Sequence, residues 1–81
     1  MFGNLMVVRA YVLVNVESGS EDKVLKQLKT LNIIDEAYVS YGLYDMIIKV
    51  KNDTMEGLKE TLSYKIRNID QVRSTLTLVI M

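Results

Sequence analysis

The sequence predicts an α+β domain of the ferredoxin-like kind, in the order β-α-β-β-α-β, with two helices on one face of a four-stranded antiparallel sheet. Four segments rich in β-branched residues alternate apolar with polar positions, and two segments between them carry apolar residues at helical spacing. The length of 81 residues fits a single domain, residues 1–81. Two βαβ units, each with a right-handed crossover, form this fold.

The first strand is expected from Met6 to Val16, after a tail at residues 1–5. The Ser18-Gly19-Ser20 segment ends that strand, and either serine can cap the following helix, because Ser18 and Glu21 have the spacing of a capping box. Asn32 is the expected end of the helix. Its apolar stripe has helical spacing and comprises Val24, Leu25, Leu28 and Leu31.

Two strands are expected next, from Ile33 to Tyr41 and from Tyr44 to Lys51. A second helix follows, for which Asp53 and Glu56 have capping-box spacing, and Gly57 weakens it by about 1 kcal/mol relative to alanine. The apolar stripe of this helix comprises Met55, Leu58, Leu62 and Ile66. The last strand is expected from Val72 to Met81.

Strand alternation assigns residues to the two faces of the sheet. The face expected under the helices is wholly apolar: Val8, Ala10, Val12, Val14, Ala37, Val39, Met46, Ile48, Val50, Leu76, Leu78 and Ile80. The opposite face is expected to be mixed: Arg9, Tyr11, Leu13, Tyr38, Ser40, Asp45, Ile47, Lys49, Arg73, Thr75, Thr77 and Val79. Because a half-apolar face usually packs on another sheet, we expect a face-to-face dimer; a solvated sheet with scattered apolar residues is the alternative.

Composition limits the possible functions. A domain this small is marginally stable alone, and without cysteine it has neither disulfides nor thiolate metal sites, so oligomerisation is the expected remedy. The formal net charge is zero and no run of Lys or Arg occurs, which argues against direct nucleic-acid binding. The longest apolar stretch is too short for a membrane span and lacks a signal-peptide layout, so a cytoplasmic location is expected.

The turn between the two middle strands suggests a ligand site. Asp45, Thr75 and Thr77 are expected on one face, bordered by Gly42 and Tyr44. A carboxylate suits the ammonium group of an amino acid, and hydroxyls and backbone N–H groups suit its carboxylate. Taken singly, each residue also has a purely structural explanation, as a turn glycine, a strand threonine or a packing aromatic.

From about Val7 to Val79 the chain resembles the effector-sensing (RAM) domain of the Lrp/AsnC regulators, in a stand-alone form. The resemblance is carried by Gly19-Ser20-Glu21, Gly42-Leu43-Tyr44-Asp45, Ile66-Arg67 and the Val-x-x-Thr-x-Thr pattern from Val72 to Thr77. Gln71 stands where the family commonly has glycine. The family's helix-turn-helix of roughly 60 residues, the length of one small module, has no counterpart in the sequence.

The resemblance implies an amino-acid sensor that forms sheet-to-sheet dimers and then larger rings, commonly an octamer of four dimers. It implies no cofactor and no metal, and it allows full-length Lrp/AsnC regulators as partners. By position it assigns ligand contacts to Gly42, Leu43, Tyr44, Asp45, Ser74, Thr75 and Thr77, with Tyr38 and Ser40 as weaker additions.

Other functions on the same fold fit the residues less well. Catalysis is not expected, because the chain has no His or Cys and Asp45 is an isolated acid. An RNA-binding RRM needs stacking aromatics within a basic-glycine-aromatic run on its third strand, and the segment from Tyr44 to Val50 lacks that run. Two alternatives stay open: an assembly module without ligand, and an ACT-like amino-acid-binding module whose ligand loop would be Glu17-Ser18-Gly19.

Overall fold

The computed structural model describes residues 7–80 and confirms the predicted fold. The elements are β1 (Val8–Val16), α1 (Glu21–Leu28), β2 (Ile34–Val39), β3 (Met46–Asn52), α2 (Met55–Thr61), the π-helical turn η2 (Leu62–Ile66) and β4 (Val72–Ile80). The expected tail at residues 1–5 and the expected strand start at Met6 lie outside the described residues.

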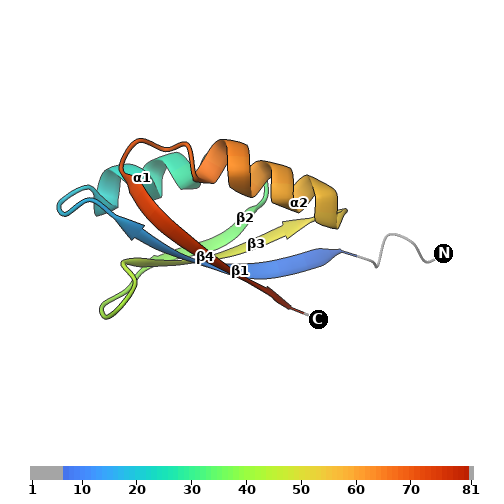
Figure 1. Ribbon diagram of the computed structural model, residues 1–81, viewed down its shortest axis with the longest axis horizontal. Helices are drawn as coiled ribbons and strands as arrows, with labels where there is room; N and C mark the ends of the chain where they lie inside the picture. Colours follow the sequence, from blue (N-terminus) through green and yellow to red (C-terminus); the bar gives the residue numbers. More distant parts are fainter. Residues whose placement is uncertain (1–6, 81) are drawn as a thin grey trace.

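All neighbouring strands are antiparallel, in the sheet order β2-β3-β1-β4. Both helices lie on one face of the sheet, and the turn between β2 and β3 extends from one end on the side away from them (Figure 1). We call the sheet face without helices the open face. The observed β2 and β3 are shorter at their shared turn than predicted, which leaves residues 40–45 as a longer connection.

The core lies between the sheet and the helices, as the alternation predicted for β1 and β3. Its fully buried members are Ala10, Val12, Val14, Val24, Leu28, Met46, Ile48, Val50, Leu58 and Ile66. Both predicted helix stripes therefore point inward, with Met55 and Leu62 packed at the margin of the core. The π-helical turn begins directly after the last residue of α2 and is closed by the Arg67 N–H, which donates to the Leu62 carbonyl at 3.0 Å.

The helix starts differ from the predictions in detail. Ser20 is the N-cap of α1, but its hydroxyl donates to the Glu17 carbonyl at 2.5 Å and caps no helix N–H. Thr54 is the N-cap of α2, and its Oγ1 accepts from the Gly57 N–H at 2.9 Å. The predicted capping box at Asp53 is therefore wrong by one residue.

The predicted faces of β4 are wrong. Thr75, Thr77 and Val79 pair with Val14, Val12 and Ala10, which places them on the helix side. Leu76, Leu78 and Ile80 pair with Leu13, Tyr11 and Arg9 and stay exposed on the open face. A register irregularity between Asn15 and Val16 leaves Arg73 as an extra residue, because Ser74 and Val72 pair with consecutive residues of β1. This bulge reverses the alternation that starts at Val72.

No helix within residues 7–80 has the length and hydropathy of a membrane span.

Candidate functional site

The turn between β2 and β3 projects two apolar side chains into solvent. Tyr41 is 99% exposed and Leu43 is 90% exposed, so neither contributes to the core of this chain. Gly42 between them has φ +133°, a conformation that side chains disfavour, although the space around it would admit a Cβ atom. The Ser40 N–H donates to the Asp45 carbonyl at 2.8 Å and closes the turn.

Asp45 attaches this turn to the end of β1. Its backbone N–H donates to the Val14 carbonyl at 3.0 Å and to Asn15 Oδ1 at 3.2 Å. One oxygen of its carboxylate, Oδ2, accepts from the Val16 N–H at 2.8 Å. Among the described residues Oδ1 has no hydrogen-bond donor and the carboxylate has no cation within 4.0 Å. The Oδ2 atom of Asp45 therefore serves the fold, and the Oδ1 atom is available to a ligand.

Pairing places four polar side chains side by side at this end of the open face. The set, which we call the end row, comprises Ser40, Asp45, Asn15 and Ser74. Asn15 Nδ2 lies 3.5 Å from Ser74 Oγ, at the outer limit of a hydrogen bond. An open cavity of about 400 Å³ is lined by Asn15, Val16, Asp45, Arg73 and Ser74. The bulge in β4 brings Arg73 to this cavity, because it interrupts the regular alternation there.

The cavity combines opposite charges with neutral hydrogen-bonding groups. The free oxygen of Asp45 suits an ammonium group, and the Arg73 guanidinium suits a carboxylate. Asn15 and Ser74 supply an amide and a hydroxyl at the same wall. This arrangement can hold both charged groups of a zwitterion.

The structure separates the predicted site residues into several groups. Asp45, Ser74 and Ser40 lie in the end row, and Gly42, Leu43 and Tyr44 belong to the adjoining turn. Thr75 and Thr77 were expected on the face of Asp45 and instead lie on the helix side. Thr77 lines a different cavity there, with Met55 and Leu62 of the second helical segment.

Tyr38 lies on the open face beside Ile47, one row further from the turn. Its hydroxyl donates to Glu36 Oε1 at 2.6 Å. This hydrogen bond, then the negative charge of Glu36 and slight desolvation, raise the pKa of the Tyr38 phenol above its usual value of 10.0.

Two contributors to the cavity, Asn15 and Arg73, were missed as site residues from the sequence. Asn15 carried a usable signal, because it continues the outward alternation of β1 toward the end where Asp45 begins β3. Arg73 was predicted on the face of Asp45, but its place beside the end row depends on the bulge in β4, so alternation alone could not assign it to the cavity.

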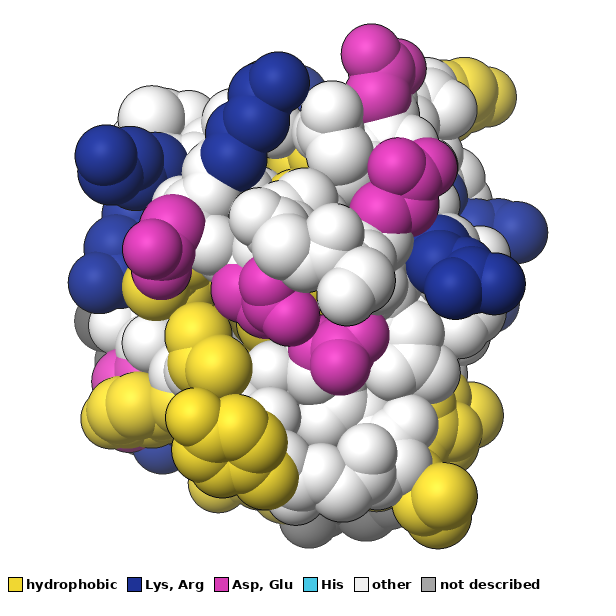
Figure 2. Space-filling view, turned by 90° about the vertical axis from the view of Figure 1, so that its left-hand side faces the viewer, with side chains coloured by type: hydrophobic (Ala, Val, Ile, Leu, Met, Phe, Trp, Pro, Cys, Tyr) yellow, Lys and Arg dark blue, Asp and Glu magenta, His cyan; other side chains and the backbone are white. Residues whose placement is uncertain are grey.

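The end of the molecule that contains the turn is shown in Figure 2. Apolar side chains gather in its lower part, beside a central group of acidic side chains, with basic groups at both margins. The exposed Tyr41 and Leu43 belong to this end.

A family model described as the Lrp/AsnC ligand binding domain matches residues 9–81. The regulatory protein AsnC of Haemophilus influenzae is 38% identical over 60 residues, which make up 74% of this chain and 40% of that protein. The chain thus spans less than half the length of this curated relative. The resemblance found in the sequence is confirmed by these matches.

Solved structures show the same fold. The crystal structure of FFRP-DM1 has a TM-score of 0.89 and 35% identity, and the match covers 91% of this chain and 99% of that one. The Neisseria meningitidis regulator NMB0573, solved as a complex with L-Met, has a TM-score of 0.83. That match covers 91% of this chain and 49% of the regulator's chain. Its identity is only 8%, so that likeness shows the fold alone.

Proposed function

Since the chain belongs to the Lrp/AsnC ligand binding domain family, we propose that it is a regulatory sensing module that binds a small amino acid at the end-row cavity and assembles through its open face. The observation that carries the ligand-binding part of the proposal is that Asp45, which has one carboxylate oxygen without a donor among the described residues, lines the same cavity as Arg73. The proposed role is not catalytic, in keeping with relatives that are regulators.

In the proposed complex, Asp45 Oδ1 accepts from the ligand ammonium while Oδ2 keeps its bond to the Val16 N–H. Arg73 and Ser74 bind the ligand carboxylate. They take the role that the sequence pattern assigned to Thr75 and Thr77. The exposed Leu43 of the turn provides apolar surface for the ligand side chain or for a neighbouring subunit.

Assembly is supported by the apolar part of the open face. Two rows of paired residues cross its middle: Tyr38, Ile47, Leu13 and Leu76 in one, and Glu36, Lys49, Tyr11 and Leu78 in the next. Leu76 and Leu78 are about half exposed. A stable interface commonly covers about 800 Å² on each partner. A second copy packed on these rows removes this apolar surface from water.

An assembly module without ligand is the second candidate. It is favoured by the bond between Asp45 Oδ2 and the Val16 N–H, since this bond gives Asp45 a purely structural use. In this version the chain co-assembles with full-length regulators of its family and binds no amino acid itself.

Calorimetric titration with each standard amino acid distinguishes the two candidates. We expect one small group of amino acids to bind the unaltered chain and not the Asp45→Asn variant, which loses the charge but keeps an acceptor for the Val16 N–H. Ser18→Ala is the control, because Ser18 lies on the loop that an ACT-like module would use. Equal binding by the Asp45→Asn variant would contradict the proposed site, and loss of binding in Ser18→Ala alone would favour the ACT-like alternative.

A further inference from the structure

The outer edge of β4 lacks the protection that an exposed strand edge usually has. Both β2 and β4 are outer strands of the sheet, and among residues 7–80 β4 pairs with β1 alone. β2 carries Asp35 and Glu36 and has a register irregularity between Ile34 and Glu36, and such features discourage the addition of another strand. β4 has no charged residue, glycine or proline from Ser74 to Ile80. Its outward N–H and C=O groups are therefore a template for a further extended strand.

A cavity lies beside this edge, between β4 and the second helical segment. Its volume is about 350 Å³, and we call it the edge cavity. No residue of β1 or β3 lines it, which places it at the outer side of the sheet. No acidic side chain lines it either, and its lining includes four apolar side chains and two cations: Met55, Leu58, Leu62, Val79, Lys59 and Arg67.

The π-helical turn brings the two cations to the same cavity. A π turn contains one residue more than an α turn, so Arg67 returns to the face of Lys59 after two turns, about 11 Å further along the axis. Leu62 lies between them in the sequence and lines the same cavity. Neither cation has a carboxylate within 4.0 Å among residues 7–80. The edge cavity therefore presents a cation, an apolar surface and a second cation in succession.

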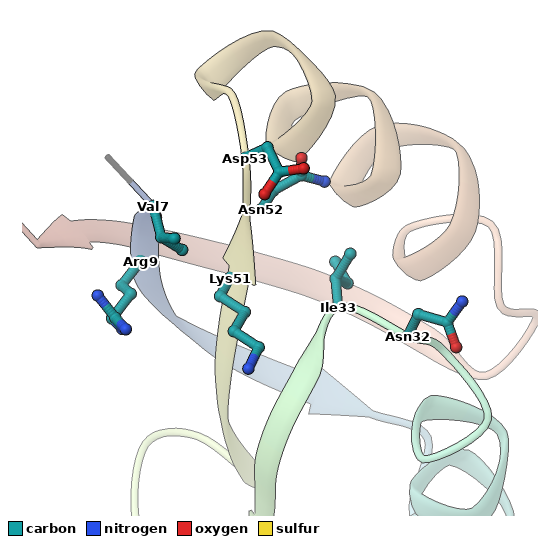
Figure 3. Close-up of a pocket in the computed structure, with 7 residues that line it drawn as sticks. All are labelled: Val7, Arg9, Asn32, Ile33, Lys51, Asn52 and Asp53. Carbon is teal, nitrogen blue, oxygen red and sulfur yellow. The ribbon is translucent and has the colours of Figure 1, made fainter. Parts of the chain in front are cut away.

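Another pair of cations, Arg9 and Lys51, lies in a different environment. Figure 3 shows both side chains pointing to the side of the sheet away from α2. Lys51 Nζ lies 3.2 Å from Asp35 Oδ1, and Asp53 lines the cavity that Arg9 and Lys51 share. That cavity already has acidic groups of the chain beside its cations, so an acidic partner is better matched to the edge cavity.

We propose that β4 and α2 form a docking groove for an extended acidic peptide, which adds as a fifth strand to the outer edge of β4. Every second side chain of the added strand points to the helix side. Two acids that flank an apolar residue at such positions lie about 13 Å apart. This distance is close to the separation of Lys59 and Arg67, whose long side chains cover the difference. The recognised pattern is acid-x-apolar-x-acid, which reads the same in both strand directions.

A second copy of the chain fits this groove less well than an acidic peptide. If it paired through its own β4, its α2 would lie next to the α2 of the first copy. The two cations of each edge cavity would then approach the same two cations of the other copy, without an acid from either lining to separate them.

Fluorescence anisotropy with labelled peptides tests the proposal. The probe is Ser-Asp-Thr-Val-Thr-Asp-Ser, which has the acid-x-apolar-x-acid pattern. A second peptide has lysine in place of both aspartates, and a third has proline in place of both threonines. The third peptide keeps the charges and loses N–H donors that an added strand needs. We expect saturable binding of the probe and affinities lower by about tenfold or more for each of the other peptides.

Two variants assign the binding to the edge cavity. Lys59→Ala and Arg67→Ala should each weaken binding of the probe about tenfold, because each removes one ion pair with the peptide. Lys65→Ala is the matched control, since Lys65 is an exposed cation of the same helical segment that lines a different cavity. Asp45→Asn should also leave probe binding unchanged, which keeps this result separate from the proposed amino-acid site.

Three results would overturn the proposal. One is equal affinity for the probe and the lysine peptide, and another is unchanged affinity in both Lys59→Ala and Arg67→Ala. The third is the absence of saturable binding by the probe, which would leave the edge of β4 to a second copy of the chain.

Discussion

Asp45 shows how one side chain can serve both the fold and a ligand. Its Oδ2 atom satisfies the Val16 N–H at the last residue of β1, where the bulge interrupts regular pairing with β4. A part-buried N–H without an acceptor is costly, so the sheet needs an acceptor at this position. The second oxygen is left for a ligand or a partner. The hydrogen bond of the first oxygen fixes the orientation of the carboxylate.

Removing that acceptor is expected to destabilise the chain. Asp45→Ala leaves the Val16 N–H without its partner, at a cost of about 1–3 kcal/mol in the free energy of unfolding. Asp45→Asn keeps an acceptor and should cost much less. Urea unfolding of the two variants beside the unaltered chain measures the difference. Equal loss in both would show that the charge, and not the hydrogen bond, stabilises the fold.

Tyr38 provides a pH prediction at the same scale. Its raised pKa means that the protonated phenol is favoured in the folded state, chiefly by the bond to Glu36. The stabilisation is fully present below pH 10.0 and is lost as the pH rises through the raised pKa. Glu36→Gln should therefore shift the tyrosinate absorbance titration of one tyrosine to lower pH, and the shift should vanish in a Tyr38→Phe background. An unchanged titration would contradict the bond to Glu36.

At the scale of elements, β4 shows where sequence patterns are insufficient. Its alternation offers two faces, and one of them is more apolar, so Leu76, Leu78 and Ile80 were predicted to be buried. In the structure the bulge at Arg73 directs these residues to the open face, and Thr75 and Thr77 face the helices. β1 and β3 left no such ambiguity, because each has one wholly apolar face. The misplacement of Thr75 and Thr77 in the predicted site follows from the same error.

The start of α2 explains Gly57, which the sequence predicted to weaken this helix. A Cβ atom at Gly57 would lie 2.8 Å from Asn52 Oδ1 and 3.0 Å from Thr54 Oγ1, the atom that caps the helix. Gly57→Ala should therefore not give the gain of about 1 kcal/mol expected from helix propensity alone. We expect no gain or a loss in thermal unfolding, and Glu60→Ala, on an exposed part of the same helix, is the control. A gain of the full propensity value would contradict the observed cap geometry.

At the scale of the whole molecule, many of the exposed large apolar side chains lie on the open face of the sheet. The composition predicted an apolar excess that a partner covers, and the structure places much of it on β4 and β1 of the open face.

Light scattering on gel filtration tests the central claim, that a second copy covers the open face. The comparison is between the unaltered chain and Leu78→Lys, which places a charge in the middle of the exposed apolar rows. We predict a dimer or a multiple of it for the unaltered chain and a shift to the monomer for the variant. A monomeric mass for the unaltered chain, or an unchanged oligomeric mass for Leu78→Lys, would contradict this account.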